Sequence, residues 1–363
     1  MELGLCKKLK ALPCNFGALT QLRSLDLTDT QVTELPESVT SNLCKLEIVI
    51  LFRGSKFPKN IRNWVELRKL TYYDRKTDGL IMPRGIEKLT RLEVLYPFIV
   101  RKEDDVSIDT CSHNSSSSSI QELADLNSLQ WLRILHLENV RGGKIEAANA
   151  KLIDKQNIQD LDLRWKSEEE EGDELAATAT MVLEGLQPHP NLEKLSIYYF
   201  PGLKPPKWMS SSSCIPNLVT LKIFSSHNCG SPVGLGQLPC LKILHMFGMK
   251  SVKCLGKDFY HQQEEEGNEG FTTTLFLSLT SLYLYDMENL EEWVAPSRPD
   301  SSFPCLEHLE IKWCSNLTSI PDLRLWASSL KRLEIEGCKV KESIPYDLKK
   351  SLTFLARLYF DGF

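Results

Sequence analysis

The stretch Pro304-Cys-Leu-Glu-His-Leu-Glu-Ile-Lys-Trp313 decides the fold. Its apolar residues Leu306, Leu309 and Ile311 follow an L-x-x-L-x-L spacing that recurs along the chain. We place the middle residue of each such phrase at positions 25, 49, 70, 95, 135, 161, 195, 221, 244, 282, 309, 333 and 358. Most intervals are about 21 to 27 residues, which is the period of a stacked repeat. The whole chain therefore consists of one kind of structural unit.

The alternation within each phrase predicts a short strand with both leucines on one side. One such unit cannot bury its leucines alone, so neighbouring units stack and share a continuous core. The spacing is the leucine-rich repeat signature. We predict an α/β leucine-rich repeat solenoid (horseshoe) of about fourteen repeats over residues 1–363. Its parallel sheet lines the concave face, and irregular segments or short helices form the convex side.

Between the strands, composition predicts exposed loop insertions near residues 101–120, 167–174, 209–214 and 261–271, where serine or charged residues replace the repeat pattern. Two segments predict helices on the convex side: 144–155, which is rich in alanine, and 175–186, which is amphipathic. The acidic run 168–171 is interpreted as a solvated loop rather than a metal site. The repeat pattern starts at the first residue and stops at Phe363, so we expect a piece of a longer polypeptide.

Charge and composition exclude several functions. The net charge of −5 and the pI near 5.9 argue against a nucleic-acid partner. No apolar run is long enough for a membrane span, and we see no secretory signal, so we expect a cytoplasmic (intracellular) protein. The eleven cysteines are then reduced thiols. Cys6, Cys314 and Cys338 are expected in the inward-facing slot that Thr30 fills in another repeat.

No catalytic pattern stands out, and we expect no enzyme, metal or cofactor. Gly142-Gly-Lys144 lacks the first glycine and the Ser/Thr of a phosphate-binding loop. Cys111 with His113, and His227 with Cys229, lack a second pair at metal-ligand spacing. A binding surface remains as the functional feature.

The residue after the last strand leucine points to the concave side, and equivalent residues stack across the sheet. These positions form one column, and the residues between the two strand leucines form a second column beside it. The two columns give our candidate protein-binding residues: Phe52, Tyr73, Tyr96, Phe98, Arg164, Tyr198, Phe224, Phe247, Tyr283, Tyr285 and Lys312. We assign Glu138 to the first column and His136 to the second. Exposed aromatic residues are typical anchors of protein interfaces. The alternative is that they pack on each other and only stiffen the sheet.

Four phrases resemble a particular family, the leucine-rich repeat region of plant intracellular nucleotide-binding immune receptors of the coiled-coil class. These are Leu137-Glu-Asn-Val-Arg with Glu146-Ala-Ala-Asn-Ala-Lys-Leu and Leu161-Asp-Leu-Arg-Trp165; Leu186-Gln-Pro-His-Pro-Asn-Leu192 with Pro206-Lys-Trp208; Leu238-Pro-Cys-Leu-Lys with Gly248-Met-Lys-Ser-Val252 and Gly256-Lys-Asp-Phe-Tyr260; and Met287-Glu-Asn-Leu-Glu-Glu-Trp293 before Phe303-Pro-Cys-Leu-Glu. The resemblance covers essentially the whole chain.

The resemblance implies a sensor of a pathogen effector or of a modified host protein. It also implies contact with the nucleotide-binding domain of the same receptor, which such repeats hold in its resting state. The nucleotide-binding and coiled-coil domains are absent from this sequence, so ADP or ATP is expected only in the missing domain. A substrate adaptor of a ubiquitin ligase is the alternative function for such repeats. It would need an F-box-like helical segment, which we do not find.

Overall fold

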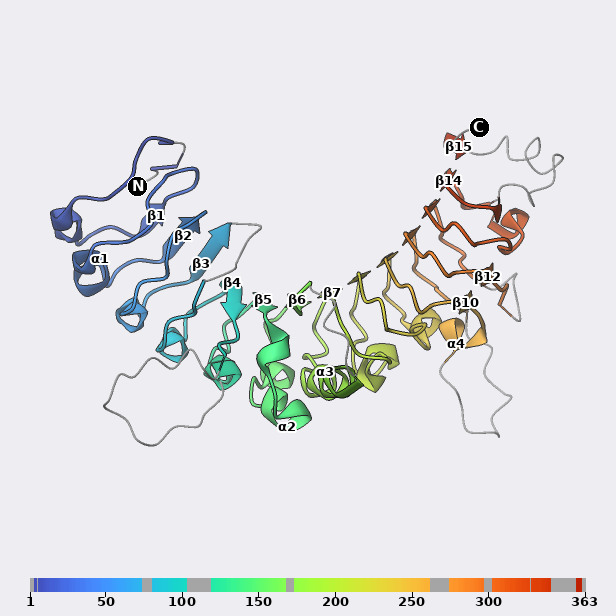
Figure 1. Ribbon diagram of the computed structural model, residues 1–363, viewed down its shortest axis with the longest axis horizontal. Coiled ribbons are helices and arrows are strands. Elements are labelled where there is room, and N and C mark those ends of the chain that lie inside the picture. The colour runs from blue at the N-terminus through green and yellow to red at the C-terminus, as the bar shows by residue number, and fades with distance from the viewer. Residues whose placement is uncertain are drawn as a thin grey trace. The chain divides into compact units, whose positions relative to one another are not determined.

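The computed structural model describes residues 3–4, 6–73, 80–102, 119–167, 173–261, 274–296, 302–326 and 328–340, and the backbone of 357–360. The chain forms two compact units, Met1–Lys166 and Ser167–Phe363. In each unit, strands line one side and short helical turns line the other (Figure 1). Each unit by itself has the leucine-rich repeat architecture that the sequence predicts.

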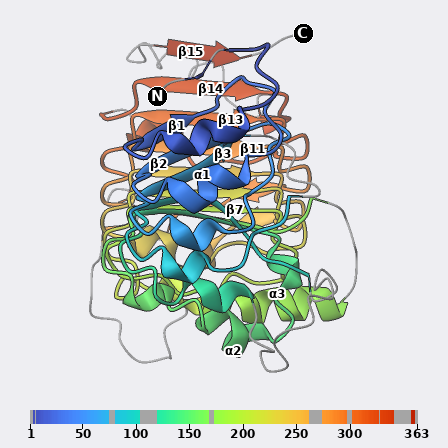
Figure 2. The same ribbon diagram turned by 90° about the vertical axis from the view of Figure 1, so that its left-hand side faces the viewer.

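The first unit contains a parallel sheet and a series of helical turns. Its strands are β1 (Ser24–Asp26), β2 (Ile48–Phe52), β3 (Lys69–Tyr73), β4 (Val94–Ile99), β5 (Trp131–Leu135) and β6 (Asp160–Arg164). Its helices are η1 (Cys14–Ala18), α1 (Glu37–Asn42), η2 (Ile61–Asn63), η3 (Ile86–Lys88), η5 (Ser119–Leu123), η6 (Leu137–Asn139), α2 (Gly143–Ala148) and η7 (Leu152–Asp154). Figure 2 shows these turns stacked one after another, with α1 near the start of the stack.

The second unit repeats this plan. Its main sheet contains β7 (Lys194–Tyr198), β8 (Thr220–Phe224), β9 (Ile243–Phe247), β11 (Ser281–Tyr285), β13 (His308–Lys312), β14 (Arg332–Glu336) and β15 (Arg357–Phe360). A second parallel pair joins β10 (Cys254–Leu255) to β12 (Glu292–Trp293). The helices are α3 (Asp173–Gly185), η8 (Lys207–Ser210), η9 (Leu235–Gln237), α4 (Lys257–Tyr260) and η11 (Leu323–Trp326).

Strand register confirms the repeat phrase at twelve of its thirteen positions. Leu282 pairs with Leu309, and Leu309 pairs with Leu333, so the same residue of each repeat meets across the sheet. These leucines are fully buried. Side chains alternate between the two sides of a strand, so the residues between the leucines form an open sheet face in each unit.

One phrase is placed wrongly by the sequence. Leu132, not Leu135, pairs with Leu95 and with Leu161. Leu129, Leu132 and Ile134 form the phrase, and Leu137 belongs to η6. Both choices satisfy L-x-x-L-x-L, and all of these leucines are buried, so only the contacts between repeats decide the register.

The core of the second unit extends away from the sheet as an aromatic cluster. Phe276 stacks on Phe303 at 4.6 Å between ring centroids, and Trp293 stacks on Trp326 at 5.5 Å. The Trp293 indole N–H donates to the Tyr260 hydroxyl over 2.7 Å, which satisfies the indole N–H inside the core. This cluster fixes the turns behind the strands.

Other segments confirm or correct the expectations. The predicted helix at 175–186 is α3, whereas 144–155 contains α2 and then η7. The insertions at 101–120, 167–174 and 261–271 lie largely outside the described residues, as does the acidic run 168–171. The predicted insertion at 209–214 is not exposed throughout, because Met209 and Ser210 at its start are buried. Cys314 is buried as expected, but Cys6 is exposed.

Candidate protein-binding face

The open sheet face of the second unit carries the aromatic side chains. We call Tyr198, Phe224, Phe247, Tyr283 and Tyr285 the aromatic patch. The register of β7, β8, β9 and β11 places Tyr198, Phe224, Phe247 and Tyr285 in one row, with Tyr283 two residues before Tyr285. All five are half-buried. The parallel register thus collects residues far apart in the sequence into one surface.

The rings of the patch contact each other closely. Tyr198 and Phe224 stack at 4.8 Å between centroids, and Phe224 lies 6.1 Å from Phe247. Tyr283 stacks on His245 at 4.1 Å. Burial, together with Lys222, lowers the pKa of His245 to about 4, so this imidazole is neutral at pH 7. The patch is therefore a preorganised, mainly apolar surface.

Two further aromatic residues flank the patch, and sequence reasoning missed them. Tyr199 follows β7 and Trp313 follows β13; they lie 6.4 Å from Tyr198 and 6.2 Å from Tyr285 between ring centroids. Trp313 is 51% exposed. Both have φ of +57°, a left-handed conformation that costs a side-chain-bearing residue about 1–2 kcal/mol.

The residue after the strand has a positive φ in other repeats as well, where it is often small or polar. Ser225, Gly248, Asp286 and Gly337 fill this position. A bulky aromatic residue there is unusual, and that substitution is the sequence signal that would have identified Trp313. Strained residues of this kind cluster at functional sites.

A charged cluster adjoins the patch on β13 and β14, formed by Glu310, Lys312, Arg332, Glu334 and Glu336. The Lys312 ammonium lies 2.8 Å from Glu334 and 3.7 Å from both Glu310 and Glu336. Arg332 lies 3.1 Å from Glu310 and 2.6 Å from Glu334. The Glu310 and Glu334 side chains are 8% and 6% exposed, so their charges require these partners.

Hydrogen bonding within the cluster shifts its pKa values. The Lys312 hydrogen bond lowers the pKa of Glu334 and raises the pKa of Lys312. The Tyr285 hydroxyl donates to the Glu310 carboxylate. Burial, with the neighbouring Glu310, raises the pKa of Tyr285. The cluster is thus joined to the aromatic patch through Tyr285.

In the first unit, the predicted face residues separate into two groups. Phe52 and Tyr73 are register neighbours on β2 and β3, and Tyr73 is 45% exposed. On β4 and β5, the Arg133 guanidinium carbon lies 3.4 Å from the centroid of the Tyr96 ring, a cation–π geometry.

The Arg133 guanidinium continues into a chain of ion pairs across β5 and β6. It donates to Asp162 over 2.8 Å, and Arg164 donates to the same carboxylate over 2.8 and 3.1 Å. Asp162 is 6% exposed. These pairs hold Tyr96 and Arg164 in a polar part of the face.

Phe98 does not lie on the open face. It is fully buried and pairs with Ile134, a core residue of β5. The register shifts between Leu95 and Phe98 because β4 has one residue more than β5 in this interval. Such a bulge turns the following side chains to the other side of the strand. Our placement of Phe98 was therefore wrong.

His136 and Glu138 also leave the columns assigned to them, because that repeat begins three residues earlier. Arg133 and Leu135 occupy the two positions instead. His136 lies after β5 with φ of +61°, and its ring nitrogen Nδ1 lies 2.8 Å from the Glu138 carboxylate.

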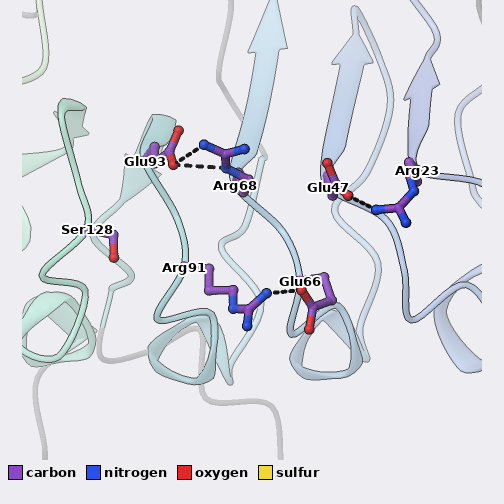
Figure 3. A pocket seen from close by; sticks show the side chains of 7 residues that line it. All are labelled: Arg23, Glu47, Glu66, Arg68, Arg91, Glu93 and Ser128. Carbon is purple, nitrogen blue, oxygen red and sulfur yellow. Dashed lines mark hydrogen bonds and ion pairs between the residues drawn. The ribbon is translucent and has the colours of Figure 1, made fainter.

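A pocket on the first unit is lined by Arg23, Glu47, Glu66, Arg68, Arg91, Glu93 and Ser128 (Figure 3). Arg23 pairs with Glu47, Arg68 with Glu93, and Arg91 with Glu66, each pair joining adjacent repeats. These residues precede the strands, so we call this surface the lateral edge. Its charges are paired and exposed, which makes them weak contributors to stability.

The described residues contain no group of three or more His, Cys, Asp or Glu side chains arranged to hold a metal ion. Among the same residues, no helix is long and apolar enough to cross a membrane.

Comparisons with known proteins point to one functional class. Residues 120–249 match the family model of R13L1/DRL21 leucine-rich repeats. The disease resistance protein RGA2 of Solanum bulbocastanum is 33% identical over 65% of this chain and 23% of its own length. The putative disease resistance RPP13-like protein 1 of Arabidopsis thaliana is 32% identical over 64% of this chain and 22% of its own. The disease resistance protein RPP8 of Arabidopsis thaliana is 26% identical over 90% of this chain and 32% of its own.

These matches confirm the resemblance that the four sequence phrases carry. The chain is similar to plant disease resistance proteins and spans about a fifth to a third of their length. The leucine-rich repeats of such proteins are protein-interaction modules.

Among solved structures, the plant peptide hormone receptor RGFR1 in complex with RGF2 covers 90% of this chain and 57% of its own at 15% identity, with a TM-score of 0.39. A TDR receptor covers 90% of this chain and 61% of its own at 13% identity, with a TM-score of 0.40. The assignment of the fold rests on the repeats of the chain itself.

Proposed function

We propose that this chain, whose repeats are related to those of plant disease resistance proteins, is the protein-recognition region of an intracellular immune receptor. It senses a pathogen effector or a modified host protein. In the resting receptor it also restrains the nucleotide-binding domain. The observation that carries the proposal is the half-exposed aromatic patch on the sheet face of the second unit, in a chain similar to disease resistance proteins.

The patch has the physical character of an interface centre. Tyrosine and tryptophan give large contact areas with few rotatable bonds, and interface hot spots are enriched in them. Stacking of Tyr198 on Phe224 fixes both rings before a partner arrives, which lowers the entropy cost of binding. The charged cluster supplies a polar rim beside them.

The alternative role, stiffening of the sheet, does not require the flanking residues. Tyr199 and Trp313 lie at the turns after the strands and expose 36% and 51% of their surface. Their left-handed backbone would be less strained with glycine. A binding role explains why aromatic residues stand there.

Restraint and sensing both depend on the free-energy difference between a packed state and a released state of the receptor. A ligand shifts the receptor only if it binds the released state more tightly than the packed state. To change the ratio of released to packed receptor from 1:99 to 99:1, the ligand must bind the released state more tightly by about 5.5 kcal/mol. The loss of a few aromatic anchors, each worth about 2 kcal/mol or more, could remove that preference.

Partner capture in plant leaves tests the proposal. Three tagged forms are compared in the presence and absence of a pathogen: the wild type, an aromatic-patch variant (Tyr198→Ala, Phe224→Ala, Phe247→Ala, Tyr285→Ala) and a lateral-edge control (Glu66→Ala, Arg68→Ala, Arg91→Ala, Glu93→Ala). The control changes the same number of residues without changing net charge. Circular dichroism confirms that each form is folded.

We expect the wild type and the control to retain a nucleotide-binding receptor fragment or a pathogen protein that the aromatic-patch variant loses. Equal capture by all three forms would contradict the assignment of the face. Recovery of ubiquitin-ligase subunits in place of these partners would favour the adaptor function.

A further inference from the structure

Two cysteines occupy the same position in adjacent repeats of the second unit. Cys314 follows β13 and Cys338 follows β14, each two residues beyond the last strand residue. We propose that Cys314 and Cys338 are a peroxide-sensitive thiol pair that closes to a disulfide between the two repeats. This inference does not depend on the proposed function.

Strand register places the two residues side by side. Lys312 pairs with Glu336 at the end of the parallel β13–β14 ladder. The next residues, Trp313 and Gly337, have nearly the same φ, +57° and +63°, so the two backbones continue alike. Neighbouring strands lie about 4.7–4.9 Å apart, within the 4.4–6.8 Å that a disulfide allows between Cα atoms.

The two thiols also have equivalent surroundings. The Cys314 sulfur lies 3.7 Å from the Leu284 carbonyl oxygen and 3.6 Å from that of Lys312. The Cys338 sulfur lies 3.7 Å from the carbonyl oxygen of Ile311, which is the register partner of Leu284, and 3.2 Å from that of Glu336. Both side chains therefore point the same way. Parallel Cβ atoms at the strand spacing need to approach by roughly 1 Å to reach the mean separation of a disulfide.

The two sulfurs differ in reactivity, as a reacting and a resolving thiol must. Cys314 is buried and Cys338 is partly exposed. The Cys314 thiol hydrogen-bonds to Cys338 and lowers the pKa of Cys338, whereas the same interaction and burial raise the pKa of Cys314. The thiolate is the nucleophile, so Cys338 is the sulfur that attacks peroxide first.

The chemistry balances with one peroxide. The Cys338 thiol releases its proton and the thiolate attacks hydrogen peroxide. The O–O bond breaks, and the leaving hydroxide takes up the released proton, so that sulfenic acid and water form. The Cys314 sulfur then attacks the Cys338 sulfur, the S–O bond breaks, and the thiol proton leaves with the hydroxyl as a second water. Two thiols are oxidised by two electrons in total, and a thiol reductant reverses the step.

The bond would link β13 to β14, which carry the charged cluster. It closes a loop of 24 residues, and loop closure of this size reduces the unfolded population about 300-fold in the chain-entropy model. Equivalent positions in preceding repeats hold Ser226, Met249 and Met287, so within these repeats the pair is confined to β13 and β14.

Peptide mapping of the folded full chain tests the proposal. The protein is treated with stoichiometric hydrogen peroxide, denatured in alkylating reagent and digested with trypsin. We expect peptide 313–324 linked to peptide 333–339, with the linked peptide lost on reduction. The exposed Cys254 and Cys305 act as internal controls and should be recovered alkylated.

Two variants separate the steps. Cys338→Ser removes the thiol that reacts with peroxide without changing the buried one, and Cys314 of this variant should stay reduced. In Cys314→Ser, Cys338 should accumulate as a sulfenic acid that a dimedone probe labels. The proposal is overturned if Cys338 oxidises to sulfinic acid without a link to Cys314. It is also overturned if the link forms only after denaturation.

Discussion

The buried leucine row is the feature on which the whole fold depends, and Leu309→Ala tests it. Leu309 is fully buried and lies between Leu282 and Leu333, which are fully buried as well. Truncation removes contacts with both neighbouring repeats. Buried Leu→Ala changes cost about 2–5 kcal/mol, and the cost rises with the cavity that remains. Because both neighbours belong to rigid strands, we expect a value in the upper half of that range.

Urea unfolding, followed by circular dichroism and by tryptophan fluorescence, measures the change in the free energy of unfolding. Leu277→Ala is the matched control, because Leu277 is 50% exposed and should cost less than about 0.5 kcal/mol. A loss below about 0.5 kcal/mol for Leu309→Ala would refute the shared core. Equal losses for both variants would refute it as well.

Three further predictions concern positions that the sequence alone misjudged or missed. Phe98→Ala should lower the free energy of unfolding by about 3–5 kcal/mol and the half-buried Phe52→Ala by clearly less; similar urea midpoints would argue against the bulge. Lys155→Met removes an ammonium that is fully buried and donates to the Leu123 carbonyl over 2.6 Å, so it should cost about 1–3 kcal/mol. Burial lowers the pKa of Lys155 from 10.5 to about 8, so the unfolded state binds more protons than the folded state between these two pH values. The contribution of Lys155 to the free energy of unfolding should therefore rise from pH 8 to 10.5. A pH-independent difference in the free energy of unfolding between wild type and variant would contradict this. Trp313→Gly relieves a left-handed residue and should leave unfolding within about 1 kcal/mol of wild type while weakening partner capture; unchanged capture would remove Trp313 from the interface.

The repeat pattern predicted the strands because a leucine row must face a shared core whatever surrounds it. It failed at Leu135 because three buried leucines satisfy the same spacing there. It failed at Phe98 because the register shift in β4 depends on pairing with β5, which is a tertiary contact. Local spacing thus determines an ordinary strand, but not a bulge.

The candidate face could be predicted in part for the same reason. Alternation placed Tyr198, Phe224, Phe247 and Tyr285 on one side of their strands, and the register aligned them. Trp313 was missed because its position follows from the backbone conformation after the strand, which alternation does not describe. Whether any of these residues binds a partner remains a prediction.

Binding titration of the first captured partner tests the central claim most directly. The wild type, the aromatic-patch variant and the lateral-edge control are compared for the dissociation constant of that partner. We predict that the aromatic-patch variant binds about 100-fold more weakly or worse, since hot-spot truncations cost about 2 kcal/mol or more each, and that the control matches the wild type. Equal affinity of the patch variant and the wild type, with both folded, would contradict the claim that this face recognises protein.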